Sequence, residues 1–355
     1  MNNTEIKTEV YKPDIKEPER EIIEKAGAVI KRGGLVAFPT ETVYGLGGNA
    51  LNPGASKKIY EAKGRPSDNP LIVHICELEA LERIVREIPE NALRLAQAFW
   101  PGPLTMIFNK KPVVPNETTG GLDTVAVRFP DNRIALELIK ASGGYIAAPS
   151  ANRSGRPSPT TAERVIEDMD GVIDMILDGG QSVIGLESTI VDLTTDTPLI
   201  LRPGYISDEM IKKVLGSAEY DLAILGKPKE GLRPRAPGMM YRHYAPRGEL
   251  KIVSGEEEKV CSYIRSCCRE LEALGKRTAV IASEETFLEY EAVKVINIGR
   301  REDEEGIARA LYESLRDCDD SNIDVIFSEE FMTPRLGTAI MNRLTKAAGY
   351  EIIKV

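Results

Sequence analysis

The stretch Lys63-Gly64-Arg65-Pro66-Ser67-Asp68-Asn69-Pro70 precedes the apolar run Leu71-Ile72-Val73-His74-Ile75. This order predicts a stiff polar loop joined to a buried strand. Lys63 and Arg65 stand two positions apart, so both can face one polyanion such as a phosphate chain, and Gly64 lets the backbone come close to it. The alternative is a solvated surface turn that carries two cations by chance, and the octapeptide alone favours that alternative.

Around this stretch, helix-like and strand-like segments alternate from residue 19 to residue 215. Apolar residues at helical spacing predict helices at 19–31, 55–62, 78–85, 90–99, 134–140 and 162–169. Thr160 and Thr161 are expected to cap the last of these helices. Short apolar runs predict strands at 35–38, 71–75, 104–108, 124–129, 145–148, 175–177, 188–192 and 199–201. This alternation predicts one α/β domain with a mixed sheet.

Two of the predicted strands open onto loops that can bind a small polar ligand. Strand 35–38 leads into 39–48, which we expect to be one tight loop rich in glycine and threonine. Strand 145–148 leads into 149–160, which is rich in serine and also holds one asparagine and two arginines. Ligands of open α/β sheets lie beyond strand ends of this kind. For the first loop, a β-turn that only reverses the chain is an equal alternative.

Two side chains interrupt otherwise apolar strands. His74 shares one face of its strand with Ile72, while the other three apolar residues of the run take the opposite face. It can therefore point into a cleft, although a lone histidine among apolar residues is more often structural. Arg128 lies near the end of strand 124–129, where an edge-strand arginine that reaches solvent is the alternative.

The C-terminal region predicts a second, smaller sheet. Strands are expected at 250–253, 278–282, 293–298, 324–327 and 351–355. Helices are expected between them at 257–274, 305–315 and 338–347. This order is typical of a doubly wound parallel sheet. The region contains neither GxGxxG nor GxxxxGK(S/T), the two glycine-rich nucleotide-binding motifs, so no nucleotide site is predicted for it. Acidic residues outnumber basic ones there, which disfavours binding to RNA.

The segment from Lys227 to Arg247, between the two regions, is basic. Six cations stand against the single acid Glu230, namely Lys227, Lys229, Arg233, Arg235, Arg242 and Arg247. Apolar and aromatic residues such as Met239 and Tyr241 give the segment too much apolar surface to float freely. We therefore expect it to dock over the anion site as a lid, and a solubilising connector is the alternative.

The composition excludes several classes of protein. A net charge of −9 argues against a chain that coats nucleic acid or an anionic membrane. Five cysteines without a paired CxxC spacing indicate neither a disulfide framework nor a zinc site. The first 20 residues are polar, and no run approaches the roughly 18 apolar residues that a membrane span needs. We expect a cytoplasmic protein without a membrane partner.

Six motifs in this order resemble the threonylcarbamoyl-AMP synthase family in its two-domain form. They are Pro39–Gly47 (PTETVYGLG), Lys63–Pro70, Ser150–Asn152, Ser188–Asp192, Arg202–Gly204, and Pro237-Gly238 with His243–Pro246. The resemblance implies an N-terminal tail over 1–20, a YrdC-like catalytic domain over 21–217, the basic linker or lid over 218–247, and a Rossmann-like domain over 248–355.

The resemblance also implies a reaction. The family joins L-threonine, bicarbonate and ATP into threonylcarbamoyl-AMP and pyrophosphate, and a partner complex transfers the threonylcarbamoyl group to tRNA. Both reactants of the adenylation step are anionic, so the site needs cations and amides more than a covalent nucleophile. Mg²⁺ is expected to arrive with ATP, because the motifs contain few carboxylates for a metal cage. A non-catalytic RNA-binding module is the main alternative. A dinucleotide-dependent oxidoreductase is disfavoured, because the sequence lacks the glycine-rich motif of such enzymes.

The resemblance assigns residues to two sets. The ATP set consists of Lys63, Arg65, Asn69, Thr124, Ser150, Asn152, Ser158, Arg202, His243 and Tyr244. Within it, Lys63 and Arg65 are the expected catalytic residues that bind the phosphates. The threonine set consists of Thr42, His74, Arg128 and Ser188. Arg128 is the natural bidentate partner for the substrate carboxylate. No residue is assigned to a metal.

Overall fold

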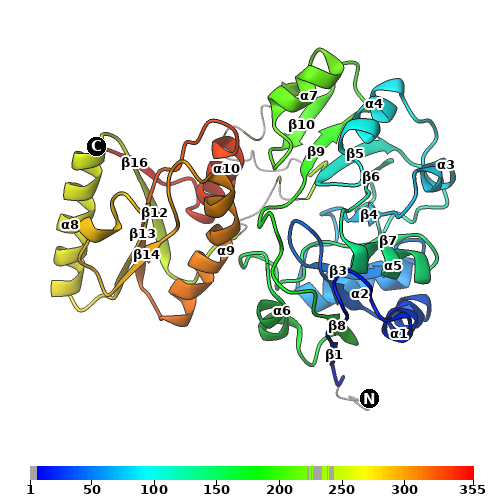
Figure 1. Cartoon of the computed structure of the whole chain (residues 1–355), viewed down its shortest axis with the longest axis horizontal. Coiled ribbons are helices and arrows are strands. Elements are labelled where there is room, and N and C mark those ends of the chain that lie inside the picture. The colour runs from blue at the N-terminus through cyan, green and yellow to red at the C-terminus, as the bar shows by residue number, and fades with distance from the viewer. Residues whose placement is uncertain (1–5, 222–223, 225, 227–233, 238, 240–243) are drawn as a thin grey trace. The chain divides into compact units, whose positions relative to one another are not determined.

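The computed structural model describes residues 6–221, 224, 226, 234–237, 239 and 244–355 (Figure 1). The chain forms two compact units, which are described separately below. The first consists of Met1–Ser154, Ser158–Val183 and Glu187–Met240. The second consists of Tyr241–Val355 together with the short segments Gly155–Pro157 and Ile184–Leu186.

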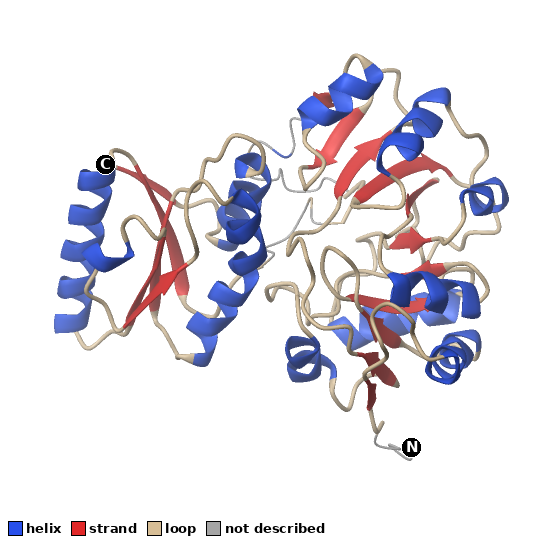
Figure 2. Cartoon of the chain, viewed as in Figure 1, coloured by secondary structure: helices blue, strands red, loops and turns tan. Residues whose placement is uncertain are grey.

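The first unit contains a mixed sheet with helices packed on it (Figure 2). Its strands are β1 (Glu9–Tyr11), β2 (Val36–Phe38), β3 (Gly45–Asn49), β4 (Ile72–His74), β5 (Leu104–Asn109), β6 (Thr124–Arg128), β7 (Ile146–Ala147), β8 (Met175–Leu177), β9 (Thr189–Asp192), β10 (Leu199–Arg202) and β11 (Glu219–Tyr220). Its helices are α1 (Arg20–Lys31), α2 (Pro53–Lys63), η1 (Leu78–Ala80), α3 (Leu81–Ile84), α4 (Glu90–Phe99), α5 (Arg133–Ala141), α6 (Ala162–Met169) and α7 (Asp208–Leu215). In the described residues the strand order is β1-β8-β2-β3-β7-β4-β6-β5-β9-β10-β11. The mixed α/β fold predicted for this region is confirmed.

Successive side chains along β4 and its flanking residues point to opposite faces of the sheet, one facing the core and the other the site. Leu71, Val73 and Ile75 belong to the main hydrophobic core of the unit. Ile72 belongs to a smaller cluster on the other face, so His74 lies on that second face as its spacing predicts. The face that carries His74 therefore also carries the polar site described below.

The expectation of one loop over 39–48 is wrong for its second half. Gly45–Asn49 forms β3, which pairs antiparallel with both β2 and β7. A Cβ atom at Gly47 would lie 2.9 Å from both Ile146 Cγ2 and Phe38 Cε1. Glycine is needed here because neighbouring side chains fill the space over the strand. The loop itself is shorter and covers 39–44.

Two further details differ from the sequence prediction. The segment assigned to an N-terminal tail contributes β1, which pairs in parallel with β8 through Val10 and Ile176. Thr161 is the N-cap residue of α6, but its side chain makes no capping hydrogen bond. The pairing of β1 with β8 joins segments far apart in the chain, which the local sequence does not determine.

The second unit is the parallel sheet that the C-terminal pattern predicts. Its strands are β12 (Glu249–Ser254), β13 (Thr278–Ala282), β14 (Lys294–Asn297), β15 (Val325–Glu329) and β16 (Ile352–Lys354). They pair in parallel in the order β14-β13-β15-β12-β16. Helix α8 (Glu257–Ala273) covers one face, and α9 (Glu304–Asp320) and α10 (Gly337–Ala347) cover the other, with a short η3 (Phe287–Glu289) after β13 (Figure 1). None of the helices in the described ranges has the length and hydropathy to cross a membrane.

Candidate active site

A row of polar side chains crosses three neighbouring strands of the first sheet. The backbone register places Arg128 of β6 opposite His74 of β4 and also opposite Thr105 of β5. Residues directly opposite one another point to the same face of a sheet. All three side chains are buried. The structure thus brings together two members of the threonine set and adds Thr105, which the sequence analysis did not single out.

His74 is held as a neutral imidazole. Its Nδ1 lies 3.1 Å from the carbonyl oxygen of Ile72, so the tautomer with the proton on Nδ1 donates to that oxygen. Burial, and after it the adjacent positive charge of Arg128, lowers the pKa of His74 to about 3. The ring therefore adds no second cation beside Arg128 near neutral pH.

The most unusual feature of the row is an acidic partner of Arg128. Nη2 of Arg128 lies 2.7 Å from Oε1 of Glu41, and the two side chains are only 5% and 9% exposed. The charges are in contact, yet neither Glu41 oxygen makes a hydrogen bond of acceptable geometry within the described residues, nor do Nε and Nη2 of Arg128. Sequence reasoning missed Glu41. The available signal was its position as the only charge in the motif Pro39–Gly47.

The other two members of the threonine set lie beside this row. Ser188 Oγ is 2.7 Å from Thr105 Oγ1 and accepts a hydrogen bond of 3.1 Å from Nη2 of Arg202. It therefore connects the row to one residue of the ATP set. Thr42 follows Glu41 directly, and its Oγ1 is 2.8 Å from Thr40 Oγ1.

Lys63 and Arg65 are held by backbone carbonyl groups. Lys63 is only 3% exposed, and its Nζ donates hydrogen bonds of 2.5 Å to the carbonyl oxygens of Ser150 and Asn152. Arg65 is half-buried and donates to the carbonyl oxygen of Pro70 at 3.1 Å. Gly64 ends α2 with a φ of +60°, which only glycine adopts easily. Its left-handed conformation ends the helix and by itself accounts for glycine, and the close approach of a ligand stays a prediction.

The remaining members of the ATP set are placed as follows. Ser150 Oγ donates to Asn152 Oδ1 at 2.5 Å, and Ser158 Oγ donates to Glu187 Oε1 at 2.6 Å. Asn69 is buried, and its Oδ1 has no hydrogen-bond partner in the described part of the chain. Thr124 is the first residue of β6, four positions before Arg128.

Tyr244 and His243 of the ATP set differ from the others in location. Tyr244 belongs to the second unit, where its ring stacks on Tyr312 with centroids 5.3 Å apart. His243 lies outside the described residues.

Hydrogen bonds join the loops that carry the two sets. The backbone N–H of Ala151 donates to the carbonyl oxygen of Tyr44 at 2.8 Å, and the N–H of Tyr44 donates to that of Pro159 at 2.9 Å. Ser182 Oγ donates to the carbonyl oxygen of Thr40 at 3.1 Å. The loop with Glu41 and Thr42 is thereby fixed against the loop with Ser150 and Asn152.

The described part of the basic linker also contacts the face of the sheet that carries His74. Ala236 and Met239 pack in the cluster that includes Ile72. Arg235 forms ion pairs with Asp192, at 3.2 Å, and with Asp221. Arg247 pairs with Asp319 in the second unit. These two cations are neutralised by the protein's own carboxylates, so they do not support the idea that the linker's charge serves bound phosphates. The other four cations lie outside the described residues.

Potential metal ligands do not converge in the part of the chain that can be described. Among those residues, no three histidine, cysteine, aspartate or glutamate side chains form a group that could hold an ion.

Comparison with known proteins covers nearly the whole chain. A family model described as "Telomere recombination" matches residues 28–204, and one described as "Threonylcarbamoyl-AMP synthase, C-terminal domain" matches residues 206–349. The threonylcarbamoyl-AMP synthase of Pyrococcus abyssi is 51% identical, over 93% of this chain and 95% of its own length. That of Bacillus subtilis is 48% identical, over 94% of each chain.

Solved structures agree with the sequence comparisons. The crystal structure of P. abyssi Sua5 complexed with L-threonine superposes with a TM-score of 0.91 and 48% identity, covering 99% of both chains. The family resemblance noted from six motifs is confirmed by these matches, and so is the two-domain α/β fold. The chain belongs to the threonylcarbamoyl-AMP synthase family.

Proposed function

We propose that this chain is a nucleotidyltransferase that forms threonylcarbamoyl-AMP and pyrophosphate from L-threonine, bicarbonate and ATP. The observation that carries the proposal is the buried Arg128, held in one row with His74, in a chain that matches a threonine-bound relative over 99% of its length. A guanidinium with available hydrogen-bond donors, shielded from water, suits the carboxylate of an amino acid.

The chemistry requires charge stabilisation more than a covalent nucleophile. N-carboxylated threonine attacks the α-phosphorus of ATP, so two anions must approach each other. In this proposal Arg128 binds the threonine carboxylate, and neutral His74 and Ser188 border the same site. Lys63 and Arg65 stabilise the negative charge that develops on the phosphates, as preorganised cations do in other sites of phosphoryl chemistry. The fixed contact between the two sets of loops would hold both reactants in register.

Several parts of the proposal concern molecules other than the amino acid. Mg²⁺ enters bound to ATP and keeps mostly phosphate and water ligands. The product passes to a complex that transfers the threonylcarbamoyl group to tRNA, and the chain itself binds nucleic acid weakly. We place the reaction in the cytoplasm.

We also propose that segment 218–247 covers bound ATP. The packing of Ala236 and Met239 on the face that carries His74 supports a position over the site. ATP with threonine should then reduce hydrogen exchange in the peptide from Arg233 to Pro246, whereas a passive tether would exchange equally with and without ligands.

The decisive test is pyrophosphate release from ATP. The purified chain should release pyrophosphate only when threonine and bicarbonate are both present. Omission of either should reduce release to the rate of a sample without protein. Release that does not depend on threonine would contradict the proposal, and binding of RNA without any release would favour the non-catalytic alternative.

A further inference from the structure

We propose that Glu41 binds the α-ammonium group of the amino-acid substrate, so that Glu41 and Arg128 together recognise a zwitterion. This inference rests on the proposed function, because it names a further residue of the same threonine site. Neither the family resemblance nor the relatives' names assign a role to Glu41.

The first step of the argument is the incomplete bonding of the pair. The guanidinium and the carboxylate lie 2.7 Å apart and are both at least nine-tenths buried. A buried charge pair normally satisfies its remaining donors and acceptors with neighbouring groups, because a buried polar group without a partner destabilises the fold. Here both carboxylate oxygens and two guanidinium nitrogens lack a hydrogen bond in the described residues. The pair therefore keeps its hydrogen-bonding capacity for something else.

The second step is the chemical match. An α-amino acid carries a carboxylate and an ammonium group on the same carbon, so the two charges of the ligand are as close together as those of the pair. Arg128 supplies donors to the carboxylate, and Glu41 supplies acceptors to the ammonium. A ligand with only one of these groups would satisfy only one half of the pair.

The third step is the surrounding electrostatics. His74 is neutral near neutral pH and brings no competing charge. Lys63 directs its ammonium group to the carbonyl oxygens of Ser150 and Asn152. The negative charge of Glu41 is felt outside the pair, because burial and then Glu41 raise the pKa of Asp131. Glu41 thus presents a negative potential that suits a cationic group of a ligand.

Ligand series on the unmodified protein test the idea first. Calorimetric binding of L-threonine is compared with that of 2,3-dihydroxybutanoate, which has a hydroxyl in place of the amine, and with L-threoninamide, which lacks the carboxylate charge. Each analogue should bind about 100-fold more weakly than threonine, because each leaves one buried charge unpaired. Equal affinity for threonine and the hydroxy acid would overturn the inference. Absence of threonine binding would instead contradict the proposed function.

Substitution then links the amine to Glu41. Glu41→Gln should weaken threonine about 100-fold and change the affinity for 2,3-dihydroxybutanoate by less than about 3-fold, so the preference for the amine is lost. A merely structural Glu41 would lower both affinities equally, which would overturn the proposal. Glu41→Asp keeps the charge and should retain part of the preference. If Glu41→Gln does not fold, this variant and the ligand series decide the question.

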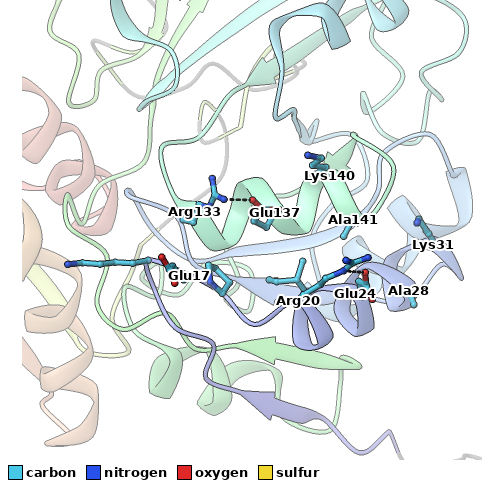
Figure 3. A pocket seen from close by; sticks show the side chains of 12 residues that line it. Glu17, Arg20, Glu24, Ala28, Lys31, Arg133, Glu137, Lys140 and Ala141 are labelled. Atoms are coloured by element: carbon cyan, nitrogen blue, oxygen red, sulfur yellow. Dashed lines mark hydrogen bonds and ion pairs between the residues drawn. The ribbon is translucent and has the colours of Figure 1, made fainter.

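The chain offers a matched control on its surface. Glu137 forms an ion pair of 2.8 Å with Arg133 on α5, in a groove of about 900 Å³ between α1 and α5 (Figure 3). Arg133 is 59% exposed, so the charge of this pair is shared with water. Glu137→Gln should leave the affinities for threonine and for both analogues unchanged. A loss of amine preference in this control would mean that the effect does not come from the site.

Discussion

Each unit of the chain buries a glutamate against an arginine, and the two pairs are completed differently. In the second unit, Glu329 accepts hydrogen bonds from Arg301 Nη2 at 2.5 Å, from Tyr290 Oη at 2.6 Å and from the backbone N–H of Ser283 at 3.2 Å. The hydroxyl of Thr286 also donates to it. In the first unit, Glu41 touches Arg128 but neither of its oxygens accepts a hydrogen bond from a described residue.

Under our proposal, this difference separates a structural ion pair from a ligand-binding one. Glu329 is satisfied by donors of its own unit, so it joins strands and loops without needing a ligand. Glu41 and Arg128 have polar atoms that no described residue satisfies, so they could bind a ligand. The contrast lies in the two glutamates, because Arg301 Nε also lacks a hydrogen bond in the described residues.

The largest expected effects concern the two cations of the phosphate loop. Lys63→Ala and Arg65→Ala should each lower kcat by about 10² to 10³, because each removes a cation that stabilises developing charge. Only Lys63→Ala should also lower the melting temperature, since Lys63 is buried on two carbonyl groups and Arg65 is half-exposed. Pyrophosphate release and thermal unfolding measure the two effects separately. Full activity of either variant would place that residue outside the catalytic machinery.

Exchange of arginine for lysine tests the comparison directly. Arg128→Lys should weaken threonine about 100-fold and ATP little, because an ammonium cannot form the two parallel hydrogen bonds of a guanidinium with a carboxylate. The matched control is Arg301→Lys in the second unit, which should leave both affinities unchanged. Isothermal calorimetry with each ligand gives the result. Equal weakening of threonine and ATP by Arg128→Lys would contradict the assignment of Arg128 to the carboxylate.

Glu329→Gln should affect stability and not catalysis. The substitution replaces a carboxylate that accepts several hydrogen bonds, and we expect the second unit to lose about 2–3 kcal/mol. Trp100 is the only tryptophan and lies in the first unit, so its fluorescence reports on that unit alone. The loss should appear in unfolding followed by circular dichroism and not in tryptophan fluorescence. Reduced pyrophosphate release by the folded variant would give Glu329 a part in the reaction.

The sequence predicts the elements better than it predicts the site. Alternation within Leu71–Ile75 is a local signal, and it places both the strand and the face of His74 correctly. The sequence of segment 45–49 predicts a loop, because its three glycines disfavour a strand. They are suited to a strand only because of Phe38 and Ile146, which pack over it.

The site depends on strand register, which no local pattern contains. His74 and Arg128 could each be proposed from their own strands, but their adjacency arises from the parallel pairing of β4 with β6. Glu41 could not be proposed as a partner of Arg128, because 87 positions of chain separate them and the contact is set by the fold. The C-terminal sheet was easier to predict because each of its long helices and strands has a strong period of its own.

The smallest expected effect concerns the histidine beside Arg128. The pKa of His74 is about 3 in the folded protein and about 6.5 in an unfolded chain. Between these values the unfolded state binds one proton more than the native state, so stability is fully present above pH 6.5 and is lost as the pH falls. At pH 5.5 this group alone should cost about 1 kcal/mol relative to pH 7.5 or above. Urea unfolding followed by Trp100 fluorescence at both pH values measures the loss in the first unit. His74→Gln, which cannot be protonated, should remove that part of the pH dependence. Identical pH dependence of the variant and the unmodified chain would show that His74 is already accessible to protons in the native state. Water would then reach the polar side chains beside Arg128.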